Sequence, residues 1–209
     1  MTGQVHTRAE LSAVQHRRRR SVALGLVLVM AVALCTATQW KPASLGRLLL
    51  EDVGLVLIAV AVIGRAWCSL YIGGRKAAEL VTTGPYSISR NPLYLFSFVG
   101  ASGVGAQSGS LTLSAIFVLA AMAIFLPLIA REEMFLAHTM PQFDTYRRST
   151  PKLLPRPSLW CSPHQITIQP ALFLRTLFDG LPFVLAWPVF DVIEAFQRSG
   201  LLPVIARLP

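Results

Sequence analysis

Long runs of apolar residues, separated by short polar and basic segments, dominate the pattern of this chain. The first run, SVALGLVLVMAVALCTATQW at 21–40, carries no charge and is about long enough to cross a bilayer as a helix. It follows the basic sequence HRRRR, so a signal peptide is the rival interpretation. The length of the run, the weak cleavage site in TAT and the interfacial residues Trp40 and Lys41 favour a membrane-spanning helix.

Further apolar runs predict three more crossings. The second covers residues 53–72 and is interrupted by Arg65. Residues 91–130 contain no charged side chain, which is roughly twice the length of one span. The sequence QSGS at 107–110 supplies a turn in the middle of this run. The pattern therefore predicts a helical hairpin for the third and fourth crossings.

The tail at 170–209 includes the apolar sequence ALFLRTLFDGLPFVLAWPVFDVIEAF, which nevertheless contains Arg175, Asp179, Pro182 and Pro188. Its uncharged part, residues 180–190, is too short to cross a bilayer by itself. We expect an interfacial or re-entrant pair of helices there, in preference to a fifth crossing. The predicted fold class is an all-α polytopic membrane protein with four transmembrane helices, or five if the tail crosses.

The distribution of Lys and Arg predicts the orientation in the membrane. The N-terminus, the loop at 73–90 and the chain after Arg131 carry many of the basic residues, so the positive-inside rule places them in the cytoplasm. Three regions result: a basic cytoplasmic tail at 1–20, a membrane domain at 21–157 and a C-terminal extension at 158–209. The expected location is a bacterial inner membrane.

Composition excludes several classes of protein. The chain is 54% hydrophobic and 14% charged, with a mean hydropathy of +0.56, which is too apolar for an ordinary soluble domain. Its net charge of +9 comes largely from clusters that flank apolar runs, so we expect no nucleic-acid partner. The three cysteines are widely spaced and the four histidines are scattered, so we expect neither a disulfide framework nor a metal site.

One polar segment borders the longest uncharged run. TTGPYSISRNPLY at 82–94 combines an Arg, an Asn, two tyrosines and two prolines, although lipid disfavours charge and free backbone groups. The hairpin should bring this segment close to REE at 131–133. A guanidinium can hold a carboxylate, carboxylates can hold an ammonium or ribose hydroxyls, and aromatic rings can cover an adenine. S-adenosylmethionine has all of these parts.

Several motifs together carry a family resemblance. They are LVTTGPYSISRNPLYL, GASGVG, REEMFLAH, FDTYRR and PKLLPRP, with GRAWCSL at 64–70 upstream. Over residues 55–157 the chain resembles the isoprenylcysteine carboxyl methyltransferase and phospholipid methyltransferase group of integral membrane enzymes. The resemblance implies an S-adenosylmethionine-dependent methyltransferase whose cofactor enters from the cytoplasm. It also implies a lipophilic acceptor, a carboxylate, thiol or amine, that enters from the bilayer.

The resemblance also implies roles for particular residues. The expected cofactor-binding residues are Tyr86, Arg90, Asn91, Tyr94, Gly103, Gly105, Glu132, Glu133 and Tyr146. Arg90 and Glu133 are the expected catalytic pair, and Glu133 is preferred to its neighbour because adjacent helical residues point about 100° apart. Arg65 and Trp67 are the expected acceptor contacts. Arg65 could equally snorkel to the headgroups, and the glycines could equally serve helix packing.

Three features differ from the family pattern. Asn91 occupies the position of the usual His, which puts any acid–base role there in doubt because an amide does not titrate. The usual glycine before the closing tyrosine is missing from TMPQFDTY, where Pro141 can form the turn. The tail beyond Pro157 has no counterpart in the pattern.

Two other functions fit parts of the pattern. A membrane reductase of the steroid-reductase type has similar C-terminal Tyr, Arg and Pro segments but uses NADPH. A non-catalytic membrane scaffold would use the polar residues for topology alone. The preferred hypothesis is methyl transfer by in-line displacement at a sulfonium, in which the protein aligns donor and acceptor and excludes water.

Overall fold

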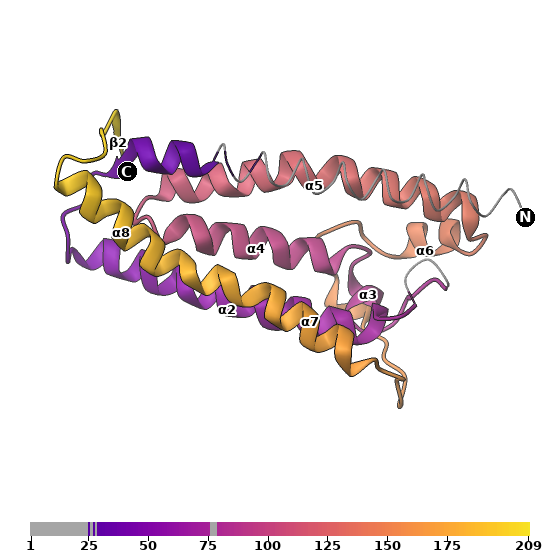
Figure 1. Ribbon diagram of the computed structural model, residues 1–209. Helices are drawn as coiled ribbons and strands as arrows, with labels where there is room; N and C mark the ends of the chain where they lie inside the picture. The colour runs from indigo at the N-terminus through magenta and orange to yellow at the C-terminus, as the bar shows by residue number, and fades with distance from the viewer. Residues whose placement is uncertain (1–24, 26, 28, 76–78) are drawn as a thin grey trace, which may run out of the picture.

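The computed structural model describes residues 25, 27, 29–75 and 79–209, and most of them are helical (Figure 1). The main helices are α2 (Leu45–Ile72), α4 (Pro92–Ala106), α5 (Leu111–Thr139), α7 (Pro170–Gly180) and α8 (Ala186–Arg198). The short elements are β1 (Thr36–Thr38), α3 (Pro85–Ile88), α6 (Phe143–Ser149), η1 (Pro157–Leu159), η2 (Leu181–Leu185) and β2 (Ala206–Leu208). Residues 29–35, before β1, are also helical. The predicted basic tail at 1–20 and the start of the first predicted span lie outside the described residues.

The long helices form an elongated bundle in which α4 lies between α2 and α5 (Figure 1). Small residues permit this close packing. A Cβ added at Gly103 would lie 2.6 Å from the carbonyl oxygen of Gly54 on α2. A Cβ added at Gly105 would lie 2.5 Å from the Cα of Ser114 on α5. The backbones of neighbouring helices therefore touch where α4 has no side chains.

The predicted helical hairpin is formed by α4 and α5. Pro92 occupies the first turn of α4, where a missing N–H is tolerated. The turn contains Gly109 with a φ of 67°, a conformation that favours glycine. Ser110 caps α5 by accepting a hydrogen bond from the Leu113 amide at 3.2 Å. Because α5 continues to Thr139, the REE sequence lies inside the helix and not after its end.

Three helical segments are long and apolar enough to cross a membrane in the part of the chain that the structure describes. They are Leu45–Ile72, Leu111–Thr139 and the continuous segment Pro170–Arg198, whereas α4 is a shorter apolar helix. These lengths and compositions indicate an integral membrane protein. Among the residues that the structure describes, the departures from an all-α fold are β1 and β2, two strands of three residues each that pair in parallel.

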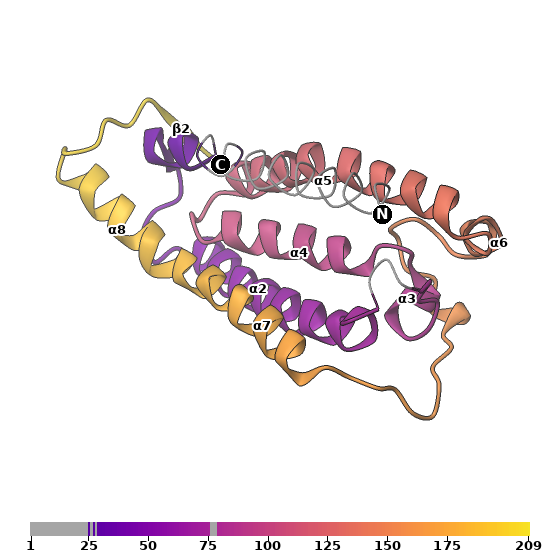
Figure 2. The ribbon, with the colours of Figure 1, turned by 45° about the vertical axis from the view of Figure 1, so that its right-hand side comes forward.

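The tail differs from the expected re-entrant pair. In Figures 1 and 2, α7, η2 and α8 follow one another in a single direction along α2. A Cβ at Gly73, where α2 ends, would lie 3.6 Å from Leu172, and a Cβ at Gly180 would lie 2.9 Å from Val62 on α2. The tail is therefore antiparallel to α2. The sequence argument was that the uncharged part at 180–190 is too short to cross alone, but η2 carries the helix past Pro182 without reversing the chain, so α7, η2 and α8 form one longer segment.

The end of the chain also lies where the sequence did not predict it. We call the two ends of the bundle the Arg90 end and the Arg47 end. At the Arg47 end, Arg47 at the start of α2 binds both carboxylate oxygens of Glu194 on α8, at 2.8 and 2.6 Å. β2 pairs with β1 there, and Ser110 donates to the carbonyl of Pro209 at 2.8 Å. Residues 199–209 are thus at the end opposite Arg90, whereas positive-inside counting placed them on the same side.

Candidate functional site

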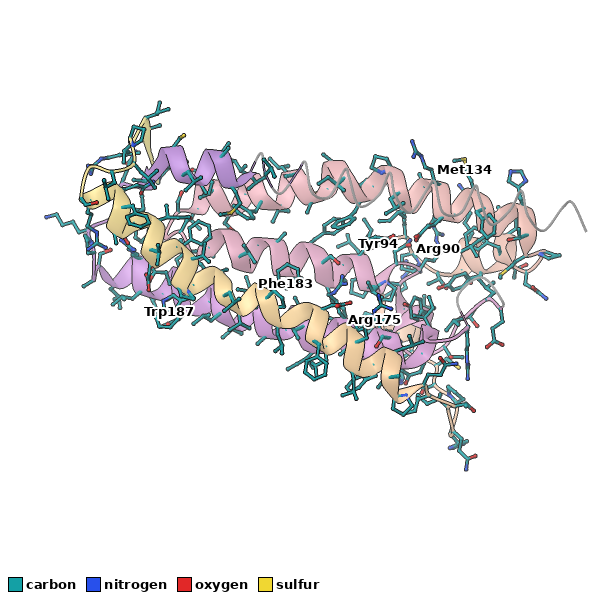
Figure 3. All side chains as sticks on the ribbon, in the orientation of Figure 1. Arg90, Tyr94, Met134, Arg175, Phe183 and Trp187 are labelled. Atoms are coloured by element: carbon teal, nitrogen blue, oxygen red, sulfur yellow. The ribbon has the colours of Figure 1, made fainter. Side chains whose placement is uncertain are left out.

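Two residues far apart in the sequence meet at the Arg90 end. The Nε of Arg90, just before α4, donates to Glu133 Oε1 on α5 at 3.0 Å. Asn91 donates from Nδ2 to the same oxygen at 3.1 Å. The two charged side chains are only 9% and 11% exposed. The structure brings Arg90, Asn91 and Glu133 together at the base of the hairpin, and Figure 3 shows Arg90 beside Tyr94 in this region.

Local sequence explains how the chain enters this junction. Gly84 has a φ of 61°, and a Cβ there would lie 2.2 Å from the ring of Tyr71. Pro85 and Pro92 begin α3 and α4. Asn91 stands at the N-cap of α4 but makes no side-chain cap bond, because its amide is turned toward Glu133. The segment at 84–92 is a rigid turn that aims two adjacent polar side chains at α5.

The remaining contacts of this junction come from residues 147–161, which we call the strap. The Nη1 of Arg90 donates to the backbone carbonyls of Arg147 at 2.6 Å and Thr150 at 3.0 Å. Asn91 donates to the carbonyl of Lys152 at 3.1 Å. The same guanidinium that pairs with Glu133 therefore also satisfies two carbonyls at the end of α6.

The strap continues alongside the segment at 84–91 through backbone contacts. The Arg90 amide donates to Pro151 O at 2.9 Å, and the Arg156 amide donates to Ile88 O at 2.9 Å. The Gly84 amide donates to Cys161 O at 2.7 Å, and the Cys161 amide donates to Ser87 Oγ at 3.0 Å. The strap residues were not among the predicted site residues, because they act here through main-chain groups, which side-chain identity does not reveal. The motif PKLLPRP at 151–157, which lies within the strap, was the feature of the sequence that could have pointed to it.

Buried tyrosines line the inner side of the junction. Tyr146 donates its hydroxyl to the carbonyl of Tyr86 at 2.6 Å. Burial raises the pKa of Tyr146 above its ordinary value, although the Arg90 charge acts in the other direction. Burial raises the pKa of Tyr86 well above the ordinary value too. Both phenols are therefore neutral at physiological pH. Tyr94 is also buried, and its ring centroid lies 5.5 Å from that of Phe125.

An open groove of about 640 Å³ lies next to the junction. Its lining is mostly uncharged and rich in hydroxyl groups: Leu80, Thr82, Ser87, Pro141, Gln142, Thr145, Tyr146, Ser149, Thr150, Leu159 and Cys161. The size is within the range of small-molecule sites. Tyr146 and Thr150 line the groove, and the carbonyl of Thr150 also accepts from Arg90, whereas Arg90 and Glu133 are not among the lining residues.

The other predicted residues occupy different places. Gly103 lies about 16 Å along α4 from Pro92, at 1.5 Å per residue, so neither it nor Gly105 is brought to the junction. Both contact neighbouring helices, as the packing interpretation expects. Glu132 is less buried than Glu133, its neighbour on α5. Glu133 is the one that reaches Arg90.

The two predicted acceptor residues lie on α2. Arg65 is half-buried and donates from Nη1 to the hydroxyl of Ser97 on α4. Trp67 stacks on Trp160 with ring centroids 5.6 Å apart, and it meets Tyr71 edge-on at 6.4 Å. Trp160 was not predicted. It fastens the last part of the strap to α2.

Within the described residues, no three His, Cys, Asp or Glu side chains gather as potential metal ligands. The residues at the Arg90 end instead provide a guanidinium, a carboxylate, an amide and neutral phenols. This set suits an organic ligand that has both charged and aromatic parts.

Comparison with known proteins identifies the class. The phospholipid methyltransferase family matches residues 45–142. The matched region includes α2, the segment at 84–91, the helical hairpin and Glu133. The chain belongs to this group of membrane methyltransferases, as its motifs indicated.

Two relatives match along nearly the whole chain. One is the nickel-cobalt-cadmium resistance protein NccN of Alcaligenes xylosoxydans xylosoxydans, 39% identical over 194 residues, which cover 92% of this chain and 91% of the relative. The other is the cobalt-zinc-cadmium resistance protein CzcN of Cupriavidus metallidurans, 35% identical over 183 residues, which cover 88% and 84%. No solved structure matches the chain. Because these shares exceed the family match at 45–142, the similarity extends into the tail that follows it.

Proposed function

We propose that this protein is an S-adenosylmethionine-dependent methyltransferase that acts on a lipophilic acceptor within the membrane. The observation that carries the proposal is the junction of Arg90, Asn91 and Glu133, which joins two separate parts of the family-matched region within 3.1 Å. Burying an ion pair costs desolvation free energy, which hydrogen bonds from neighbouring groups can offset. Buried charged groups of this kind are also common at ligand-binding and catalytic sites.

The residues at the Arg90 end suit the parts of this cofactor. The groove offers hydroxyl groups, the amide of Gln142 and the ring of Tyr146. When bound, the cofactor supplies a methyl group already activated on a sulfonium. The work of the protein is to hold the two reactants in line and to exclude water.

Glu133 is the one carboxylate of the junction, and its hydrogen bonds bear on whether it could act as a general base. Glu133 accepts from both Arg90 and Asn91, so its carboxylate is held in place and not poised to remove a proton. An acceptor carboxylate needs no base, whereas a neutral amine or thiol does. We therefore propose Arg90 and Glu133 as binding and positioning groups, with Arg65 and Trp67 on α2 as acceptor contacts.

We propose that the Arg90 end faces the cytoplasm of a bacterial inner membrane. Arg75, Arg131, Arg147, Arg148 and Lys152 surround that end, in agreement with the positive-inside rule. This orientation also gives the groove access to a cytoplasmic cofactor.

The names of the two relatives associate them with resistance to nickel, cobalt and cadmium, and to cobalt, zinc and cadmium. For this chain we propose that methyl transfer contributes to metal tolerance through its product. Thiols, amines and carboxylates are metal ligands, and a methyl group on any of them weakens or removes that ligand. In a strain that lacks the gene, the wild-type protein should restore growth on nickel, cobalt or cadmium, whereas Glu133→Gln should not. Equal rescue by both would contradict this route.

The cofactor is tested with the intact protein in detergent. S-adenosylhomocysteine should raise the melting temperature and NADPH should not, because only a ligand of the native state stabilises it. Stabilisation by NADPH alone would favour the reductase alternative, and no effect of either would favour a scaffold. Membranes incubated with methyl-labelled cofactor should then yield a labelled lipid-soluble product. Glu133→Gln, which keeps the shape of the side chain, is the matched control.

A further inference from the structure

An ion pair lies on the outer face of the tail. Arg175 Nε and Asp179 Oδ2, one turn apart on α7, are separated by 4.0 Å, and their side chains are 72% and 69% exposed. Arg175 is labelled on α7 in Figure 3. The same exposed face carries Leu174 and Phe178, which are 46% and 61% exposed. α7 therefore presents an apolar face that contains one positive and one negative group.

The packing of the tail on α2 sets the depth of this pair in the membrane. A Cβ at Gly180, the residue next to Asp179, would lie 2.9 Å from Val62. Val62 is in the middle of the predicted crossing at 53–72, and it is about 15 Å from Ile72, where α2 ends, at 1.5 Å per residue. The hydrocarbon core of a bilayer is about 30 Å thick, so Asp179 lies near its midplane.

Lipid is a poor environment for either charged side chain. Arg175 is about 8 Å nearer to the Arg90 end than Gly180 is, so its long side chain can extend toward the headgroups, whereas the short side chain of Asp179 cannot. Within the described residues, no hydrogen bond accompanies the long contact between the two groups. Charged groups inside membranes usually face protein or water, so this face of α7 requires a cover.

The charges on this face are complementary to the same face of a second copy. Two copies inserted in one orientation would pack their α7 helices in parallel about a two-fold axis along the membrane normal. Arg175 of each copy would then lie about 6 Å along that axis from Asp179 of the other copy, which is the rise of four residues. The guanidinium already covers this offset within one helix. One Arg and one Asp from each copy make a group of four charges that is neutral as a whole.

We propose that α7 is a dimerisation surface, at which Arg175 and Asp179 of one copy form ion pairs with Asp179 and Arg175 of a second copy inside the membrane. Leu174 and Phe178 pack beside the charges and exclude lipid from them. The cross-pairs favour association because lipid offers these groups no comparable partner. Among the three candidate spans in the described residues, the tail is also the least covered: 17% of its apolar stretch is buried, compared with 44% for α2 and 22% for α5.

Reversal of single charges distinguishes a second copy from any other cover. Arg175→Asp makes the face doubly acidic, and Asp179→Arg makes it doubly basic. Two differently tagged copies are expressed together, extracted in mild detergent and captured through one tag, and the co-captured amount of the other copy is measured. We expect wild type to capture wild type, and each variant to capture itself about tenfold less. Arg175→Asp should capture Asp179→Arg as well as wild type captures itself, because opposite charges then face each other.

The pair of Arg75 and Glu79 provides a matched control. It is also an ion pair four residues apart, with the two atoms 3.0 Å from each other, but it follows the end of α2 and lies outside the predicted crossing. Glu79→Arg changes the net charge by the same amount as Asp179→Arg, and it should leave the capture unchanged. Recovery of capture in the mixed pair shows that both reversed variants are folded.

Three results would overturn the inference. Wild-type copies that do not capture each other would show that no second copy covers this face. Reversed variants that associate as well as wild type would show that the two charges lie outside the interface. Loss in both variants without recovery in the mixed pair would assign the face to a different membrane protein or to lipid. None of these results bears on the proposed methyl transfer, which is measured separately.

Discussion

At the scale of single residues, Arg90 has more partners than a simple ligand-binding role requires. Its guanidinium pairs with Glu133 and also donates to two strap carbonyls, while Asn91 donates to Glu133 and to Lys152. An amide supplies both of its N–H donors at every pH, which an imidazole does only when protonated. Asn91 therefore keeps both of its donors without having to bind a proton.

The ion pair should matter for stability as well as for binding. Arg90→Ala leaves Glu133 buried without its counter-charge, so we expect a loss of about 3–5 kcal/mol in the free energy of unfolding. The double variant Arg90→Ala/Glu133→Ala should be less destabilised than the sum of the two single variants. Denaturant unfolding in detergent measures all three. Additive effects would show that the two residues are not coupled.

The two buried phenols predict a loss of stability at alkaline pH. Their pKa values are raised above the ordinary 10.0, so the folded state holds these protons more tightly than the unfolded state. Stability is then complete below about pH 10 and falls as the pH rises toward the raised values. Unfolding followed by tyrosinate absorbance checks this. Tyr146→Phe should reduce the slope above pH 10, and an unchanged slope would exclude Tyr146 as the cause.

At the scale of elements, the glycines of α4 serve the contact between helices. Gly103 is placed against Gly54 and Ile58 on α2, and Gly105 is placed against the start of α5. The GASGVG sequence is compatible with both a cofactor loop and a packed helix. In the structure both glycines lie on α4 away from Arg90 and against neighbouring helices, which supports the packing role, and their role in cofactor binding stays a prediction.

This packing can be tested with one methyl group. Gly103→Ala would bring a Cβ within 2.6 Å of a backbone oxygen, so we expect a loss of about 1–3 kcal/mol in the free energy of unfolding. Gly100→Ala is the control, because its nearest neighbour is the Ala61 side chain at 3.0 Å. A Gly103→Ala protein of wild-type stability that no longer binds S-adenosylhomocysteine would contradict the packing role and support the cofactor role.

At the scale of the whole molecule, the tail completes the bundle. The helix at 29–35, α2, α5 and α8 share one buried core that includes Val29, Val62, Phe117 and Phe190. The Arg47–Glu194 pair fastens the end of α8 to the start of α2. Because the tail runs the length of α2, it carries the C-terminal residues to the end opposite the strap.

The side of the membrane on which each end lies can be measured with cysteines. Cys161 is exposed at the Arg90 end, and Ser199 is exposed at the Arg47 end. In intact cells, a membrane-impermeant maleimide should label Ser199→Cys in a Cys161→Ser background and should leave wild-type Cys161 unlabelled. After lysis both should react. Protection of both sites in intact cells would return the tail to the re-entrant arrangement that the sequence favoured.

The sequence by itself determined the membrane class, the hairpin and the approach of Arg90 to Glu133. Apolar runs interrupted by short turns leave few ways to arrange helices in a bilayer, and the two ends of a hairpin must meet. The course of the tail and the strap carbonyls that bind Arg90 depended on tertiary structure. A hydrogen bond to a backbone carbonyl does not depend on the side chain of the accepting residue, so the amino-acid sequence does not predict it. The tail packs along α2 although Arg175, Asp179 and Pro182 interrupt its apolar sequence.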